Sequence, residues 1–180
     1  LLARGGTEKR SAEDLEERLA FLAALLNSSI GDTQGAVSLN WLSKDMDEGL
    51  ALLREVLAHP RFQEDKLALR KQQLLQSMKE RNDHAADIEQ REIGFLAYGD
   101  SFWANRLATA HSLEQIQRED LVAFHRRWFW PSNFVIAASG DFDRDSFIAK
   151  LEELFANWPF TGESPPPVPT NTVFAPPGIY

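Results

Sequence analysis

Apolar residues recur at helical spacing soon after the start of the chain. Ser11 precedes an acidic first turn, which is typical of a helix N-cap. Leucines then follow at i, i+4, i+7 and i+11, which is one face of an amphipathic helix: Leu15, Leu19, Leu22 and Leu26. Residues 27–41 change character, since Val37, Leu39 and Trp41 alternate with polar residues. This alternation and the glycines before it predict a β-hairpin with strands near 26–30 and 36–42.

The rest of the pattern is mainly helical. Asp45 or Asp47 can cap a second helix, which Pro60 ends. Further helices are predicted over 64–81, from the Asn82-Asp83 break to about Leu96, over 113–128 with a Ser112/Gln115 capping box, and around 147–155. The apolar run 134–138 predicts a buried strand. Helices and hairpins without regular βαβ alternation indicate an α+β fold.

The composition is that of an ordinary globular chain. The 180 residues are 43% hydrophobic and carry a net charge of −8, so the sequence predicts no nucleic-acid partner. Apolar stretches are too short to predict a membrane span, and no signal peptide is visible. The absence of cysteine excludes disulfides and thiolate sites but leaves the compartment open, bacterial periplasm and cytoplasm included.

The composition shifts after Trp158. Residues 159–171 are rich in proline and predict a stiff, extended linker. Residues 172–180 read as the first strand of a following domain. A first domain is therefore expected within 1–158.

No complete active site is visible in the residues. The four histidines form neither HExxH nor HxxEH, and no GxSxG, phosphate loop or dinucleotide fingerprint occurs. Chemistry alone therefore assigns no catalytic residue to this chain.

The order of several segments resembles a known family. These segments are GGTEKRSAEDLEERL, LLNSS, LSKDMDEGLALLREVLAHPRF, SLEQIQREDLVAFHRRWFWPSNFVIAASGDFD and LEELFANWP. Together they are similar to the homology domain of the pitrilysin/insulinase zinc metallopeptidases, which include mitochondrial processing peptidases. The resemblance implies an antiparallel-rich sheet backed by a layer of helices, here truncated at its N-terminal end, and two such domains in tandem.

The same resemblance places the family's zinc ligands. Active members carry HxxEH just before the Gly-Thr, and the family's spacing puts its second His at Leu1. The ligand Glu falls at Ser77 or Met78, and a companion Glu falls at Arg70 or Lys71. None of these residues is a His or a carboxylate, so we expect no metal ligand in this segment and zinc only in active relatives or a partner.

This pattern implies a non-catalytic copy that pairs with an active domain, in the same chain or in a partner subunit. In active members the strand matching LLNSS adds unfolded peptide substrate as a further strand, which makes Leu26, Asn27, Ser28 and Ser29 the candidate peptide-binding residues. An ordinary edge strand, made polar against aggregation, is the alternative reading. Two other functions stay open: an active zinc endopeptidase whose HxxEH lies upstream, and a non-enzymatic interaction module.

Overall fold

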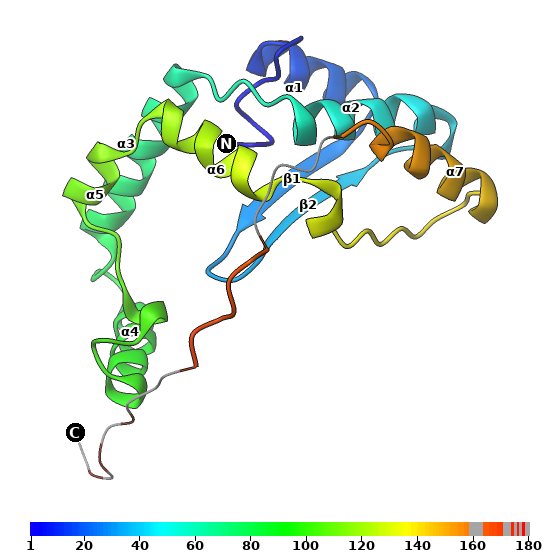
Figure 1. Ribbon diagram of the computed structural model, residues 1–180. Coiled ribbons are helices and arrows are strands. Elements are labelled where there is room, and N and C mark those ends of the chain that lie inside the picture. Colours follow the sequence, from blue (N-terminus) through cyan, green and yellow to red (C-terminus); the bar gives the residue numbers. More distant parts are fainter. Residues whose placement is uncertain (159–163, 171–173, 175, 177, 179–180) are drawn as a thin grey trace. The chain divides into compact units, whose positions relative to one another are not determined.

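The computed structural model describes residues 1–158, 164–170, 174, 176 and 178. Its contacts divide the chain into unit 1, residues 1–67 and 117–165, and unit 2, residues 68–116 and 166–180. The elements, labelled in Figure 1, are α1 (Ala12–Phe21), β1 (Leu25–Ile30), β2 (Gly35–Asn40), η1 (Ser43–Asp45), α2 (Met46–Ala58), α3 (Glu64–Glu80), α4 (Ala85–Tyr98), η2 (Trp103–Asn105), α5 (Ala110–Gln115), α6 (Arg118–Trp128), η3 (Pro131–Asn133) and α7 (Arg144–Phe155).

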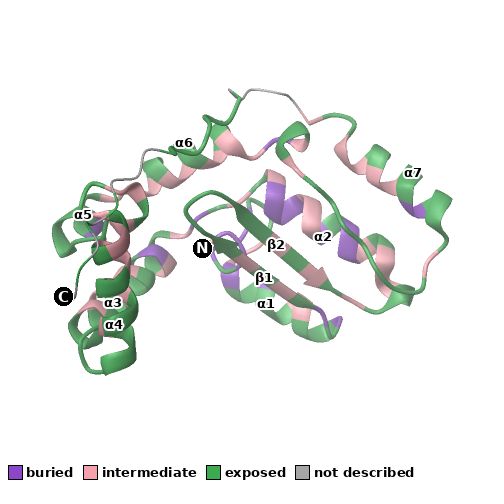
Figure 2. Ribbon diagram, turned by 90° about the horizontal axis from the view of Figure 1, so that it is seen from below, coloured by how far each residue is buried: buried purple, intermediate pink, exposed green. Residues whose placement is uncertain are grey.

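Unit 1 is a hairpin covered on one face by helices. Strands β1 and β2 pair in antiparallel fashion, with Leu26 opposite Leu39 and Ser28 opposite Val37. Helices α1 and α2 lie on the same face of this hairpin (Figure 1). Figure 2 shows the buried positions of this region on α1, α2 and the N-terminal segment, whereas β1 and β2 carry only intermediate and exposed ones.

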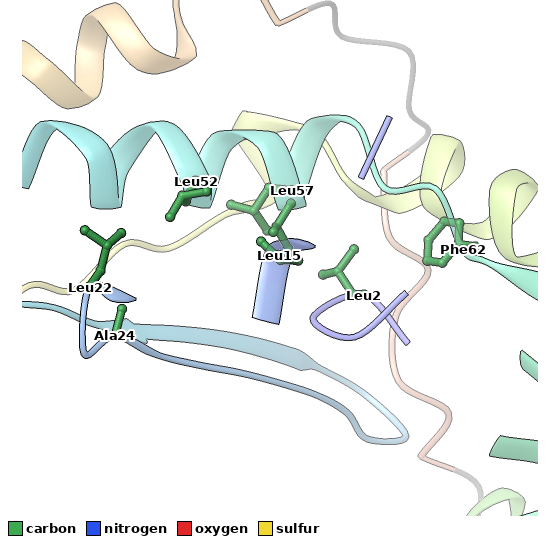
Figure 3. Packing of buried hydrophobic residues seen from close by; sticks show 8 residues of the cluster. Leu2, Leu15, Leu22, Ala24, Leu52, Leu57 and Phe62 are labelled. Atoms are coloured by element: carbon green, nitrogen blue, oxygen red, sulfur yellow. The ribbon is translucent and has the colours of Figure 1, made fainter. Parts of the chain in front are cut away.

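The core of unit 1 lies between the hairpin and these helices. Leu15 of α1 and Val56 of α2 are 1% and 0% exposed. Figure 3 shows how the core side chains from α1, α2 and the N-terminal segment converge. The buried members of the cluster are Leu2, Leu15, Leu22, Ala24, Leu52, Val56, Leu57 and Phe62. Burial of this kind stabilises a fold by roughly 25 cal/mol for each Å² of apolar surface removed from water.

Unit 2 is mainly helical. Its first part contains most of α3, then α4, η2 and α5. The side chain of Lys71 on α3 donates to the carbonyl oxygen of Glu114 on α5 at 3.0 Å. Asn105 pins the turn after α4, since its side-chain amide donates to the carbonyls of Gly94 and Gly99 at 2.9 and 2.8 Å.

Most of the predicted elements are confirmed. The cap at Ser11 is a full capping box, in which the amide of Asp14 donates to Ser11 Oγ at 3.0 Å and Asp14 Oδ2 accepts from the Ser11 amide at 3.2 Å. The hairpin and the helix that starts at Glu64 fall within one residue or two of the expected ranges. The α+β class is confirmed, with a two-stranded sheet among the described residues.

Three expectations about where helices begin, end and are capped were wrong. Leu26 does not continue the α1 stripe, because α1 ends at Phe21 and Ala23 turns the chain into β1 with a φ of 49°. The helix expected over 113–128 is two helices, because Asp120 Oδ2 accepts from the amide of Gln117 at 2.7 Å and caps a new start there. Likewise, the capping box of α5 uses Thr109 with Ser112 instead of Ser112 with Gln115.

The run 134–138 is not a strand in the structure. It has no regular secondary structure, and among the described residues β1 and β2 pair only with each other. Val135 is 100% exposed, so the run is not buried either. A strand needs a hydrogen-bonding neighbour, and the apolar pattern alone does not supply one.

The predicted linker and following strand lie partly outside the described residues. Residues 164–170 of the linker are described and have no regular secondary structure. Of the expected strand 172–180, only Phe174, Pro176 and Gly178 are described. The expected division at 158, 171 and 172 therefore stays a prediction.

Candidate functional site

The segment that would follow a zinc box is folded into the core of unit 1. Leu2 and Ala3 are 8% and 9% exposed, and Leu1 packs against the same core cluster. The carbonyl oxygen of Leu1 accepts from the amide of Arg4 at 3.0 Å, so the segment begins with a tight turn. Leu1, where the resemblance predicts the family's second His, is therefore an apolar residue that packs against the core.

Two glycines allow this segment to lie against the chain after α2. The amide of Arg61 donates to the carbonyl of Gly6 at 3.1 Å, and the amide of Gln63 donates to that of Gly5 at 3.0 Å. Gly6 has a φ of +71°, which disfavours any residue with a Cβ. A Cβ on Gly5 would lie 2.8 Å from the carbonyl oxygen of Leu1. The close approach of the two segments thus depends on this glycine pair.

Thr7 is the end of the segment and the centre of a buried polar network. It is 0% exposed, and its hydroxyl donates to Glu55 Oε1 on α2. The guanidinium of Arg10 donates to Glu55 Oε2, and the amide of Arg10 donates to Thr7 Oγ1 at 3.0 Å. Glu55 is only 8% exposed, and each oxygen of its carboxylate therefore accepts a hydrogen bond. Sequence reasoning missed this network, although the Gly-Thr motif marked one member.

The positions at which the resemblance predicts the family's ligand Glu and its companion lie on α3. Ser77 is exposed and Met78 is half-buried. Two turns earlier, Arg70 Nη1 donates to Gln73 Oε1 at 3.4 Å, and Lys71 is engaged with the Glu114 carbonyl. These side chains offer a hydroxyl, a thioether and two cations where the resemblance predicts carboxylates in active relatives.

These residues do not fit a zinc ion. Zinc in proteins takes His, Cys, Asp or Glu ligands. In the described part of the chain, no group of three such residues is placed so that it could hold a metal. The residues at the predicted ligand positions are leucine, serine, methionine, arginine and lysine, and none of them is such a ligand.

Strand β1 carries the four candidate peptide-binding residues. Leu26 and Ser28 are half-buried, while Asn27 and Ser29 are exposed. Ser28 Oγ accepts from the amide of Ala3 at 3.3 Å. The structure thus brings the peptide-binding candidate into contact with the segment that carries Leu1.

The hairpin register tells which backbone groups of β1 face away from β2. The amide of Gly31 donates to the carbonyl of Gln34 at 2.8 Å, so these two residues form a hydrogen-bonded pair. Hydrogen-bonded and non-hydrogen-bonded pairs alternate along an antiparallel ladder. Counting back along the register, Asn27 and Ser29 bond to β2, and Leu26 and Ser28 direct their amides and carbonyls to the other edge. In the described residues no further strand pairs with that edge.

One histidine is embedded in unit 1. His125 of α6 lies 2.7 Å, through Nε2, from the carbonyl oxygen of Leu57. Its ring stacks on Phe129 at 4.9 Å and meets Phe62 edge-on at 5.9 Å. Burial lowers the pKa of His125, with the hydrogen bond to Leu57 acting in the opposite sense. Its surroundings are aromatic and its neutral form donates to a carbonyl, so it is a packing residue of the domain.

Comparison with known protein families gives two matches that divide the chain. Residues 1–109 match the family model described as insulinase, peptidase family M16. Residues 115–179 match the model described as peptidase M16 inactive domain.

Curated relatives include zinc proteases and processing peptidases. An uncharacterized zinc protease of Rickettsia bellii is 21% identical over 87% of this chain and 38% of its own length. The probable mitochondrial-processing peptidase subunit beta of Arabidopsis thaliana is 23% identical over 83% of this chain and 28% of its own length. The chain therefore spans well under half of the relatives that it matches.

Solved structures share the fold. A peptidase M16 inactive domain from Pseudomonas fluorescens superposes with a TM-score of 0.75 at 24% identity, over 86% of this chain and 38% of that one. A protease from Helicobacter pylori gives 0.77 at 16% identity, over 93% and 41%. Within the described residues, no helix has the length and apolar character to cross a membrane.

Proposed function

This chain belongs to the insulinase family of peptidases, peptidase family M16, and we propose that it is a non-catalytic domain of that family. Its role is to pair with a zinc-bearing domain or subunit and to help hold an unfolded peptide. The observation that carries this proposal is the set of residues at the family's ligand positions: Leu1, Ser77 or Met78, and Arg70 or Lys71.

The surroundings of these positions support the proposal. Leu1 contributes to the core cluster, and the two residues after it are buried. Lys71 is held by a backbone carbonyl of α5, and its cationic head would repel a metal ion. Both positions therefore contribute to packing and to the tertiary structure of the domain, and neither suits metal binding.

The free edge of β1 supports the peptide-holding role. Leu26 and Ser28 direct backbone groups to an edge that no described strand covers. A peptide that pairs with such an edge gains main-chain hydrogen bonds without sequence preference. Asn27 and Ser29 make the exposed face of the strand polar, which suits an edge that must stay soluble when no peptide is bound.

Zinc binding tests the non-catalytic assignment. The purified chain is dialysed against zinc, washed and assayed for metal by elemental analysis. We expect far less than one zinc per chain. Stoichiometric zinc would overturn the proposal and favour an active peptidase.

A mixing experiment tests the pairing role. The chain is added to a zinc-bearing member of the family, and cleavage of an unfolded peptide is followed with time. We expect the chain to increase the rate. No increase would favour a separate interaction module.

Peptide binding tests the role of the β1 edge. Ser28→Pro removes the outward amide of Ser28 and its hydroxyl, whereas the matched control Ser28→Ala removes only the hydroxyl. One hydrogen bond is worth about 0.5–1.5 kcal/mol, so Ser28→Pro should bind an unfolded peptide about twofold to tenfold more weakly than Ser28→Ala. Equal affinities of the two variants would contradict strand addition at this edge.

A further inference from the structure

Unit 2 carries a cluster of aromatic side chains where α4 ends. The rings of Tyr98 and Phe102 stack at 4.9 Å with an interplanar angle of 29°, and Phe102 and Trp103 lie 5.4 Å apart. We call these three residues the aromatic platform. Gly99 turns the chain here with a φ of 78°. The side-chain amide of Asn105 donates to the carbonyl of Gly99, so a hydrogen bond stabilises the loop that carries the platform.

The proline-rich segment lies against this platform. The indole Nε1 of Trp103 donates to the carbonyl oxygen of Pro169 at 3.1 Å. Further along the chain, the ring of Phe174 lies 5.9 Å from that of Tyr98. The segment therefore contacts the platform at two points separated by a few residues.

The chemistry of the two partners is complementary. Residues 165–169 read Pro-Pro-Pro-Val-Pro, which favours the extended polyproline II conformation. Proline has no amide hydrogen, and the carbonyls of such a segment find no donor within the segment itself. Aromatic grooves recognise proline-rich segments of the PxxP type, and Pro166 to Pro169 has this spacing.

We propose that Tyr98, Phe102 and Trp103 form a receptor for extended proline-rich chain, and that this protein's own segment 166–169 occupies it. Segment 166–169 is then bound to unit 2. A stiff linker that made no contacts would instead move independently of unit 2. Docking costs little conformational entropy because polyproline II is largely preformed. The tether also keeps the segment near the platform at a high effective concentration, so an external proline-rich peptide competes poorly.

Nuclear magnetic resonance of the full chain tests this proposal. The Trp103 indole signal is assigned by its loss in Trp103→Phe, and backbone order at Val168 and Thr170 is measured by the heteronuclear ¹⁵N NOE. In the unaltered protein we expect both amides to be as ordered as those of α4. Trp103→Ala should lower both NOE values toward those of a free chain. Trp103→Phe, which keeps a ring but lacks the donor, should reduce the docked fraction relative to the undocked about twofold to tenfold.

Two further variants separate loss of docking from damage to the platform. Trp128→Phe on α6 is the matched control, and it should leave Val168 and Thr170 unchanged. The double replacement Pro166→Gly with Pro169→Gly alters only the segment, and it should speed exchange of the Trp103 indole hydrogen with water. Mobile Val168 and Thr170 in the unaltered protein would overturn the proposal. So would an indole exchange rate that the double replacement leaves the same.

Discussion

Replacing Thr7 by valine tests the buried network at the end of the N-terminal segment. Valine has a similar shape, so the change removes one hydroxyl and little volume. That hydroxyl donates to Glu55 and accepts from the amide of Arg10 at 3.0 Å. After the substitution, one carboxylate oxygen loses a donor and one amide loses its acceptor, in a place where Thr7 is 0% exposed.

The expected cost follows from these two lost partners. A buried polar group left without a partner costs about 1–3 kcal/mol. Arg10 still donates to the other oxygen of Glu55, so the carboxylate keeps an ion pair and the cost stays within that range. For a chain of this size, 1 kcal/mol corresponds to a shift of about 2–4 °C in the melting temperature. We therefore expect Thr7→Val to lower the melting temperature by roughly 2–12 °C.

Thermal unfolding and urea unfolding, both followed by far-ultraviolet circular dichroism, measure the shift in melting temperature and the loss of free energy. Thr33→Val is the matched control, because Thr33 is an exposed residue of the hairpin turn and its change should stay within about 0.5 kcal/mol. A double-mutant cycle with Glu55→Gln should give a coupling energy of about 0.5–3 kcal/mol. If Thr7→Val and Thr33→Val unfold at the same urea concentration, the network does not stabilise the segment and the reasoning is refuted.

Three further changes probe the same unit. Gly6→Ala should destabilise by about 1–2 kcal/mol or more in urea unfolding, because the φ of +71° disfavours a Cβ that would also lie 2.7 Å from the side chain of Gln63; a melting curve equal to wild type would contradict this. Leu15→Ala, at a site 1% exposed, should cost about 2–5 kcal/mol in the same assay, and a loss below 1 kcal/mol would argue against the core as described. Burial lowers the pKa of His125, so the unfolded chain binds its proton more readily and the free energy of unfolding should fall as the pH drops below about 6.5. His125→Gln should flatten that slope in urea titrations at several pH values, and identical slopes would contradict the assignment.

Local signals in the sequence account for the elements that were predicted well. Ser11 and Asp14 form a reciprocal cap between neighbours in sequence, and Pro60 follows the end of α2. The alternation of Val37 and Leu39 with polar residues reports directly which side of β2 faces the helices. Such features depend on a few adjacent residues, so the sequence suffices to place them.

Features that depend on distant partners were not predictable. The run 134–138 has the composition of a strand, but pairing requires a neighbour that its own residues do not specify. The break between α5 and α6 depends on one side chain, that of Asp120, which accepts a hydrogen bond from the amide of Gln117. Thr7 and Glu55 are 48 residues apart, and nothing in their local patterns marks them as partners.

The candidate site shows the same division. The absence of ligand chemistry at Leu1 and on α3 is visible in the sequence, since it depends only on residue types. The sequence also points to residues 26–29 as a group, but only the hairpin register separates Leu26 and Ser28, with outward backbone groups, from Asn27 and Ser29, which bond to β2. Edge geometry is a property of the pairing, and one shift of register would exchange the two sets.

The N-terminal segment links the loss of chemistry to the architecture of the domain. The resemblance predicts that active relatives hold their metal just before the Gly-Thr, whereas here Leu1 packs on the core and Leu2 and Ala3 lie within it. A histidine at position 1 would place a polar ring against that core, and it would still lack a carboxylate at Ser77 or Met78. A histidine at position 1 alone would therefore not supply the ligand set of a zinc site, and it would disturb the packing of Leu1. The packing of this segment therefore agrees with the non-catalytic role proposed above.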